Sequence, residues 1–147
     1  MSINKNNLNK IFVLQGPNLN LLKLQKSIHL KTEKLNQHIK KKSQEYNNNI
    51  IIFQTNEEGK AISRLQKYRK KISGVILFPG PWSKSGYPIL DLLNMIKIPY
   101  VTISIINKGS IFTGIKNLEG EDLLQLTSEA FLLLNNNFNL QKNDQSK

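Results

Sequence analysis

Side chains that titrate near neutral pH are rare in this sequence. The chain has 147 residues with two histidines, His29 and His38, and no cysteine. The lack of cysteine excludes a disulfide, a thiolate nucleophile and thiolate metal ligands, and two histidines are too few for a typical histidine-built metal site. We therefore expect no metal site, and any proton transfer near pH 7 would fall first to a histidine.

Two turns carry the residues best placed to meet a ligand. The segment GPN at 16–18 follows an apolar run over 11–14, and PGP at 79–81 follows another over 75–78. Short apolar runs ended by glycine and proline are typical of buried strands that lead into turns. In open parallel sheets the ligand lies at the carboxyl ends of the strands, so both turns are candidates for a site.

The elements that would position these turns alternate along the chain. Strands are predicted at 11–14, 50–53, 75–78 and 101–105, with a short fifth one at Ile111 and Phe112; helices are predicted at 32–46, 59–70, from Pro88 onward, and at 123–134. This alternation predicts an α/β protein whose parallel sheet is covered on both faces. We expect a polar N-terminal extension at 1–10, a single domain at 11–134, and a polar, frayed tail at 135–147.

The net charge of +11 comes from 21 basic and 10 acidic residues. Almost all the basic residues are lysines, and asparagine and isoleucine are abundant, which is how an AT-rich genome biases a sequence. Arginine, the residue that nucleic-acid sites favour, is scarce. We attribute the charge mainly to composition and do not expect a nucleic-acid partner. No apolar run is long enough for a membrane span, and the N-terminus has no apolar signal-peptide core, so the simplest location is the cytoplasm.

Four segments together resemble one enzyme family. The segments are IFVLQGPNLNLL at 11–22, FQTNEEG at 53–59, FPGPWSKSGYPILD at 78–91 and PYVTISIIN at 99–107. They are similar, in order and spacing, to the motifs of type II 3-dehydroquinate dehydratases. The resemblance implies a flavodoxin-like three-layer sandwich with a parallel sheet of four or five strands in the order 2-1-3-4-5. It also implies a lyase of the shikimate pathway, in aromatic amino-acid biosynthesis, that converts 3-dehydroquinate to 3-dehydroshikimate and water without a cofactor.

Part of the family's site is matched here. By resemblance, Asn18 would hold the water that stabilises the enolate oxygen, and Gly80 keeps the glycine of the NPG turn. Asp91 stands at a position that reaches a neighbouring subunit in the family's trimers and dodecamers, so we expect a homo-oligomer. The backbone N–H groups of Ile105 and Ile106 would cap the substrate carboxylate.

Several other family positions have changed. Phe78 replaces the asparagine of the NPG turn, Lys84 replaces a histidine, and Thr102 and Ser104 replace the glutamate and histidine of an EVH motif, so the general acid is missing. Lys84 would supply positive charge for a carboxylate but is a poor acid at neutral pH; a solvated surface lysine is an equally good interpretation. We include Lys84 and Ser104 in the expected substrate-binding set.

The segment after GPNLNLL lacks the family's base and its arginine. Residues 23–29 read KLQKSIH, about three residues shorter than the family pattern and without a tyrosine. His29 reaches the position of the base only if the gap is moved, and an exposed residue at the start of a helix is the simpler interpretation. An arginine-bearing family segment after Asn107 is also absent.

Three hypotheses follow from this pattern. The chain is a drifted dehydratase with weak or no activity, a non-catalytic binding or assembly protein descended from that enzyme, or a basic nucleic-acid module. The first predicts a pocket that still takes 3-dehydroquinate or a similar small molecule. The second predicts folding and assembly without turnover, and the third predicts steeply salt-dependent binding.

Overall fold

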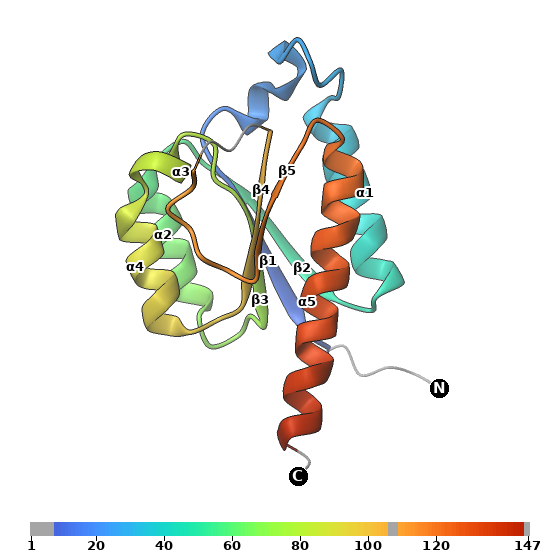
Figure 1. The fold of residues 1–147 in the computed structure, drawn as a ribbon, viewed down its shortest axis with the longest axis vertical. Helices are drawn as coiled ribbons and strands as arrows, with labels where there is room; N and C mark the ends of the chain where they lie inside the picture. Colours follow the sequence, from blue (N-terminus) through green and yellow to red (C-terminus); the bar gives the residue numbers. More distant parts are fainter. Residues whose placement is uncertain (1–7, 106–108, 146–147) are drawn as a thin grey trace.

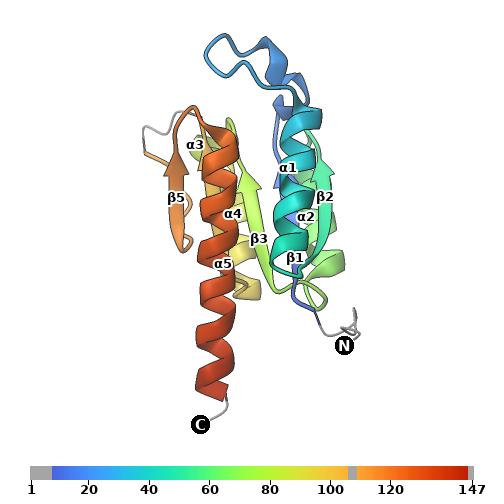
Figure 2. The same ribbon diagram turned by 90° about the vertical axis from the view of Figure 1, so that its right-hand side faces the viewer.

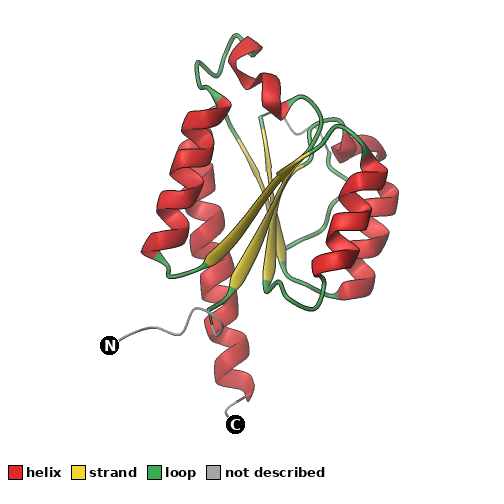
Figure 3. Ribbon diagram, turned by 180° about the vertical axis from the view of Figure 1, so that it is seen from behind, coloured by secondary structure: helices red, strands yellow, loops and turns green. Residues whose placement is uncertain are grey.

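A computed structural model describes residues 8–105 and 109–145 as a five-stranded parallel sheet between two layers of helices (Figures 1 and 3). The strand order is β2-β1-β3-β4-β5, as the resemblance implies. The strands are β1 (Lys10–Gln15), β2 (Asn49–Gln54), β3 (Gly74–Phe78), β4 (Tyr100–Ser104) and β5 (Lys116–Glu119). The first four lie within a residue or two of their predicted bounds.

The helices divide between the two faces of the sheet. They are η2 (Leu19–Leu24), α1 (Thr32–Glu45), α2 (Glu58–Tyr68), α3 (Trp82–Ser85), α4 (Tyr87–Ile96) and α5 (Leu123–Gln145). Helices α1 and α5 lie side by side on one face (Figure 2), and α2 and α4 cover the other (Figure 3). None of the helices in the described part of the chain is long and apolar enough to cross a membrane.

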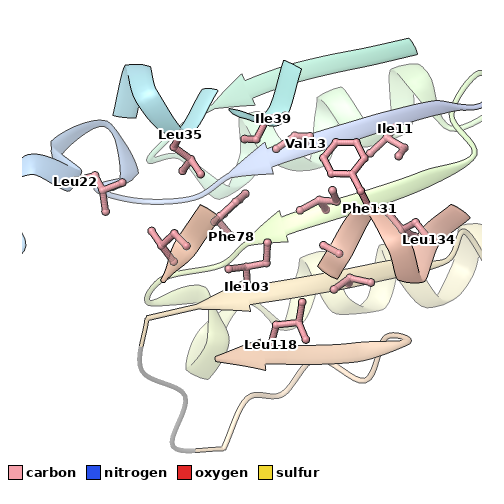
Figure 4. Close-up of a cluster of buried hydrophobic side chains, with 14 of the residues drawn as sticks. Ile11, Val13, Leu22, Leu35, Ile39, Phe78, Ile103, Leu118, Phe131 and Leu134 are labelled. Atoms are coloured by element: carbon pink, nitrogen blue, oxygen red, sulfur yellow. The ribbon is translucent and has the colours of Figure 1, made fainter. Parts of the chain in front are cut away.

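The core consists of two apolar clusters separated by the sheet. Along β1, Ile11 and Val13 point to the α1/α5 side, and Phe12 and Leu14 point to the α2/α4 side. All four are fully buried, because successive side chains of a strand alternate between faces and both faces are covered. The cluster under α1 and α5 extends to Phe78, at the carboxyl end of β3 (Figure 4).

The prediction of a fifth strand at Ile111 and Phe112 is wrong. Phe112 is a buried loop residue that packs edge-on against the ring of Tyr100, with 6.3 Å between ring centroids. Its backbone N–H donates to Ser110 Oγ, and its carbonyl accepts from Asn117 Nδ2 at 2.8 Å. Side chains therefore satisfy the backbone N–H and carbonyl groups of Phe112, which in a strand would pair with a neighbouring strand. The true strand, β5, has the sequence KNLE, whose polar character suits a sheet edge.

The prediction that the last helix ends at Leu134 in a frayed tail is also wrong. Helix α5 continues to Gln145 and projects beyond the ends of the strands (Figures 1 and 2). Two contacts hold the extra turns. The amides of Asn135 and Asn48 exchange hydrogen bonds of 2.9 and 3.0 Å, and the buried ring of Phe138 packs against Gly74, where a Cβ would lie 2.9 Å from Phe138 Cζ.

Candidate functional site

A cavity of about 490 Å³ lies at the carboxyl ends of β1, β3 and β4, where open parallel sheets place their ligands. Its walls come from the turn after β1, helix η2, the turn after β3, the end of β4 and the start of α5. The lining residues are Pro17, Asn18, Leu19, Leu21, Leu22, Leu24, Gln25, Phe78, Gly80, Pro81, Ile103, Ser104, Ile105 and Leu123. A cavity of this size is in the usual range for small-molecule sites.

The two most specific sequence motifs are held together by hydrogen bonds beside this cavity. The backbone N–H of Asn18 donates to Asn56 Oδ1 at 3.0 Å. Gln54 Nε2 donates to the same oxygen and to the carbonyl of Gly16, each at 3.2 Å. Asn18 has left-handed backbone angles, φ 73° and ψ 1°, a conformation that asparagine tolerates better than most residues. The motif after β2 therefore holds the turn that presents Asn18.

Close backbone contacts fix the same turn from the other side. The N–H of Gly16 donates to the carbonyl of Phe78 at 2.8 Å. A Cβ on Gly16 would lie 2.7 Å from that carbonyl oxygen and 2.9 Å from the carbonyl oxygen of Pro79. Only glycine lets the turns after β1 and β3 approach this closely. Gly80 completes the second turn with φ +53°, and both Phe78 and Gly80 line the cavity.

Helix η2 contributes four leucines to the lining of the cavity. Leu19, Leu21, Leu22 and Leu24 all line it, and Leu21 and Leu24 remain 45% and 67% exposed. Thr32 Oγ1 donates to the carbonyl of Leu19 at 2.7 Å and ties η2 to the start of α1. From the sequence, LNLL was interpreted as part of a family motif, and its contribution to an apolar lining was not predicted. The signal was the density of leucines outside any strand or long helix.

A buried hydroxyl group at the end of β4 has no hydrogen bond within the described part of the chain. Ser104, the last residue of β4, is 6% exposed, and its Oγ has no partner among the described residues. Thr102, two residues earlier on the same face of β4, has a partner: its hydroxyl donates to Asn117 Oδ1 on β5. Thr102 therefore joins two strands, whereas the hydroxyl of Ser104 has no such contact.

The predicted site residues fall into two groups. Asn18, Gly80, Ser104 and Ile105 line the cavity together, as expected for residues at the ends of neighbouring parallel strands. Ile106 lies outside the described residues.

The remaining three predicted positions do not line the cavity. Lys84 is exposed, and its Nζ donates to the carbonyl of Gly109 at 2.6 Å. Asp91 is exposed on α4, on the far side of the sheet. His29 is exposed with φ 50° in the segment between η2 and α1, so the interpretation as a surface residue fits the structure better than that of a base.

The cavity has little capacity for acid–base chemistry. Three of its described lining residues are polar, Asn18, Gln25 and Ser104, and none has a side chain that titrates near pH 7. Within residues 8–105 and 109–145, no group of three or more His, Cys, Asp or Glu side chains is placed to hold a metal ion. Amide, hydroxyl and backbone N–H groups would bind a ligand by hydrogen bonds alone.

The fold and the site define a flavodoxin-like α/β protein with a ligand cavity at the carboxyl end of its sheet. Residues 9–110 match the model of the class II dehydroquinase family. A 3-dehydroquinate dehydratase of Caldicellulosiruptor saccharolyticus is 40% identical over 102 residues, which cover 67% of this chain and 70% of that protein. One from Clostridium botulinum (strain Loch Maree / Type A3) is 38% identical over 103 residues, 68% of this chain and 70% of that protein.

Solved structures show the same fold. The type II dehydroquinase of Butyrivibrio crossotus has a TM-score of 0.78 at 23% identity, covering 86% of this chain and 97% of that one. A 3-dehydroquinate dehydratase-like protein from Bifidobacterium longum has a TM-score of 0.64 at 16% identity, covering 86% and 98%. The chain belongs to the class II dehydroquinase family. The family match ends at residue 110, before β5 and α5.

Proposed function

We propose that this chain acts on 3-dehydroquinate, the substrate in its relatives' names, with a turnover far below that of an intact enzyme. The reaction removes water across a carbon–carbon bond beside a ketone and yields 3-dehydroshikimate, a step of the shikimate pathway, which we place in the cytoplasm. We infer the low turnover from the residues that line the cavity. It provides hydrogen-bonding groups for a substrate but no described side chain able to exchange a proton near neutral pH.

The retained groups would bind and polarise the substrate. Asn18 would hold a water beside the substrate ketone, where an enolate oxygen would develop. By the family match, the backbone N–H groups of Ile105 and Ile106 would receive the carboxylate. Because Gly80 has no side chain, the backbone of its turn could approach the ring of the substrate closely. None of these groups takes a proton from carbon or gives one to the leaving hydroxyl.

The expected loss of turnover can be estimated from the rate enhancement that each missing group typically contributes. A positioned general acid or base contributes about 10²–10⁴-fold each, and one electrostatic donor about 10²–10³-fold. These factors do not multiply within one constellation, but the loss of both proton-transfer groups leaves little of a family rate. Phe78 adds a further cost, because an apolar ring stands where a hydrogen-bonding amide would meet the substrate.

A second candidate function is non-catalytic binding. The cavity and the hydrogen bonds between its two motifs are intact, and a protein that needs only to bind does not require a base. This alternative predicts that a ligand occupies the cavity and that no product forms.

A dehydratase assay at high protein concentration separates the two candidates. Purified protein is incubated with 3-dehydroquinate, and the conjugated product is followed by its ultraviolet absorbance. We expect a turnover at least tenfold below the usual enzyme range of about 1–10³ s⁻¹, lost on Asn18→Ala. A turnover within that range would refute the proposal. Saturable binding of substrate with no product would favour the binding protein.

We further propose that the chain forms a homo-oligomer, a trimer or a dodecamer. Asp91 keeps a family position and is exposed on the outer face of α4, where it is free to meet a second copy. Light scattering at micromolar concentration measures the mass directly. A strictly monomeric mass would contradict the proposal.

A further inference from the structure

The two edges of the sheet differ in length and in character. Strands β2 and β5 lie at opposite edges (Figure 2), and in the described part of the chain each pairs with one neighbour only. Strand β5 has four residues, KNLE, with a charged residue at either end, as is usual for an edge that faces water. Strand β2 has six residues, NIIIFQ, and no charge. The apolar run IIIF therefore stands at an edge whose own side chains give no protection against pairing with another strand.

The side chains of β2 are only partly buried, although the strand is as apolar as a central one. Each of its six residues has intermediate exposure, whereas every residue of β3 and β4 is buried. Ile50 and Ile52 pack against the core cluster under α1 and α5, and Ile51 and Phe53 pack against the cluster under α2 and α4. Since each face is packed against a core cluster, the exposure that remains lies toward the open edge.

The backbone of β2 presents a row of hydrogen-bonding groups along this edge. The N–H groups of Asn49 and Thr55 donate to carbonyl groups in the segment 9–15, at 2.8 and 2.9 Å. Backbone groups of successive residues point to opposite sides of a strand, so the odd-numbered residues of β2 bond to β1 and Ile50 and Ile52 point away from it. No described strand lies on that side, so water or a partner must satisfy these groups.

We propose that the edge of β2 binds the same edge of a second copy of this chain, in antiparallel orientation, about a two-fold axis at Ile51. In this register Ile50 of one copy faces Ile52 of the other, and each such pair exchanges both of its outward backbone hydrogen bonds. Ile51 faces its own counterpart across the axis, in a non-hydrogen-bonded pair whose side chains lie close together. The strand is therefore complementary to itself, which is what a two-fold interface requires.

The sequence of β2 favours a second copy over an unrelated strand. Antiparallel pairing sets isoleucine against isoleucine on both faces of the joined sheet, and apolar cross-strand pairs of this kind stabilise a sheet. The interface does not rest on dehydratase activity, since no residue of β2 belongs to the described lining of the cavity. It is also separate from the contact proposed at Asp91, which lies on α4.

Hydrogen exchange at single amides of the full-length protein tests the pairing. In a monomer the amides of Ile50 and Ile52 face water and exchange freely. Those of Ile51 and Phe53 are held by β1 in either state and serve as internal references. We expect Ile50 and Ile52 to become protected as the protein concentration is raised, with a mass of two copies, or a multiple of two, in light scattering. Free exchange at these two amides at every concentration, or a strictly monomeric mass, would overturn the proposal.

A charge at the two-fold axis should separate the copies. Ile51→Lys sets two lysines against each other and should raise the dissociation constant of the pair by about tenfold or more, with loss of the protection at Ile50 and Ile52. Ile98→Lys is its control, because Ile98 is also partly buried against the α2/α4 cluster but lies between α4 and β4. This control should leave association unchanged. Equal loss of association in both variants would contradict the role of β2.

A backbone variant tests the same edge without a charge. Ile52→Pro removes an outward N–H and leaves the bonds to β1, a position at which edge strands tolerate proline. It should abolish pairing while the fluorescence of Trp82, the single tryptophan, still shows cooperative unfolding in urea. Association that survives Ile52→Pro would overturn the proposal. Asp91→Lys separates the two contacts: loss of mass in Asp91→Lys alone supports the contact at Asp91 alone, and loss in Ile51→Lys alone supports this interface alone.

Discussion

Removal of the Phe138 ring should destabilise the whole domain, although it stands in a polar segment near the end of the sequence. Phe138 is 7% exposed and belongs to the core cluster under α1 and α5. Truncation of a buried phenylalanine to alanine typically costs about 3–5 kcal/mol. We take the lower end, about 3 kcal/mol, because α5 projects beyond the sheet here and the site can relax more easily than a central one.

Urea unfolding at fixed protein concentration measures this loss. Trp82 is the single tryptophan of the chain and is buried on the other face of the sheet, so its fluorescence reports the loss of the entire fold. The expected loss corresponds to a fall in Tm of about 6–12 °C for a chain of this length. Phe138→Leu, which keeps most of the apolar volume, should recover more than half of the stability.

The matched control is Leu140→Ala, two positions further along α5. Leu140 is 63% exposed, so its truncation should change stability by no more than about 0.5 kcal/mol. If Phe138→Ala behaves like Leu140→Ala, the end of α5 contributes nothing to the fold. The expectation of a frayed tail from Asn135 would then have been correct.

The remaining predictions concern pH and two glycines, one in the turn after β1 and one in α2. The pKa of His38 lies below its usual 6.5 because burial removes water from the ring, and nearby lysines, Lys42 first, add to this. The unfolded chain therefore binds the proton more readily than the folded chain, so the contribution of His38 to the free energy of unfolding should be complete above about pH 6.5 and decrease as the pH falls through that value. His38→Gln should flatten this part of a plot of the urea midpoint against pH. An unchanged plot would contradict the role given to His38. Gly16→Ala should cost about 1–3 kcal/mol in urea unfolding, because its Cβ would lie 2.7 Å from the Phe78 carbonyl oxygen. Gly59→Ala, in α2 with nothing within 4 Å of the new Cβ, should instead stabilise by about 0.5–1 kcal/mol.

The central strands could be predicted from the sequence because both of their faces are buried. Runs such as 11–14 and 75–78 are continuously apolar, and no other element of that length accounts for them. Strand β5 lies at an edge with Leu118 as its one buried side chain, so it has no continuous apolar run. The fifth strand was therefore predicted at the apolar pair 111 and 112 instead. Phe138 was missed because asparagines surround it and hide the helical spacing from Phe131 and Leu134.

Part of the site could be predicted because it sits at strand ends. Asn18, Gly80 and Ser104 follow β1 and β3 or end β4, and parallel strands bring their carboxyl ends to one edge. Lys84 and Asp91 lie further along, on helices whose direction the motif match does not give. The four leucines of η2 that line the cavity were not predicted, because a helix this short has no periodic pattern in the sequence.

The position of α5 also constrains how the chain folds during synthesis. Phe131 and Leu134 lie in the same core cluster as Ile11 and Val13 (Figure 4), so the last helix completes a core that the first strand begins. Helix α1 can cover its part of this face early, but the part over β4 and β5 stays uncovered and apolar until α5 emerges. Folding therefore cannot finish before residues 123–145 have been translated. Until then the nascent chain exposes the kind of surface that chaperones bind.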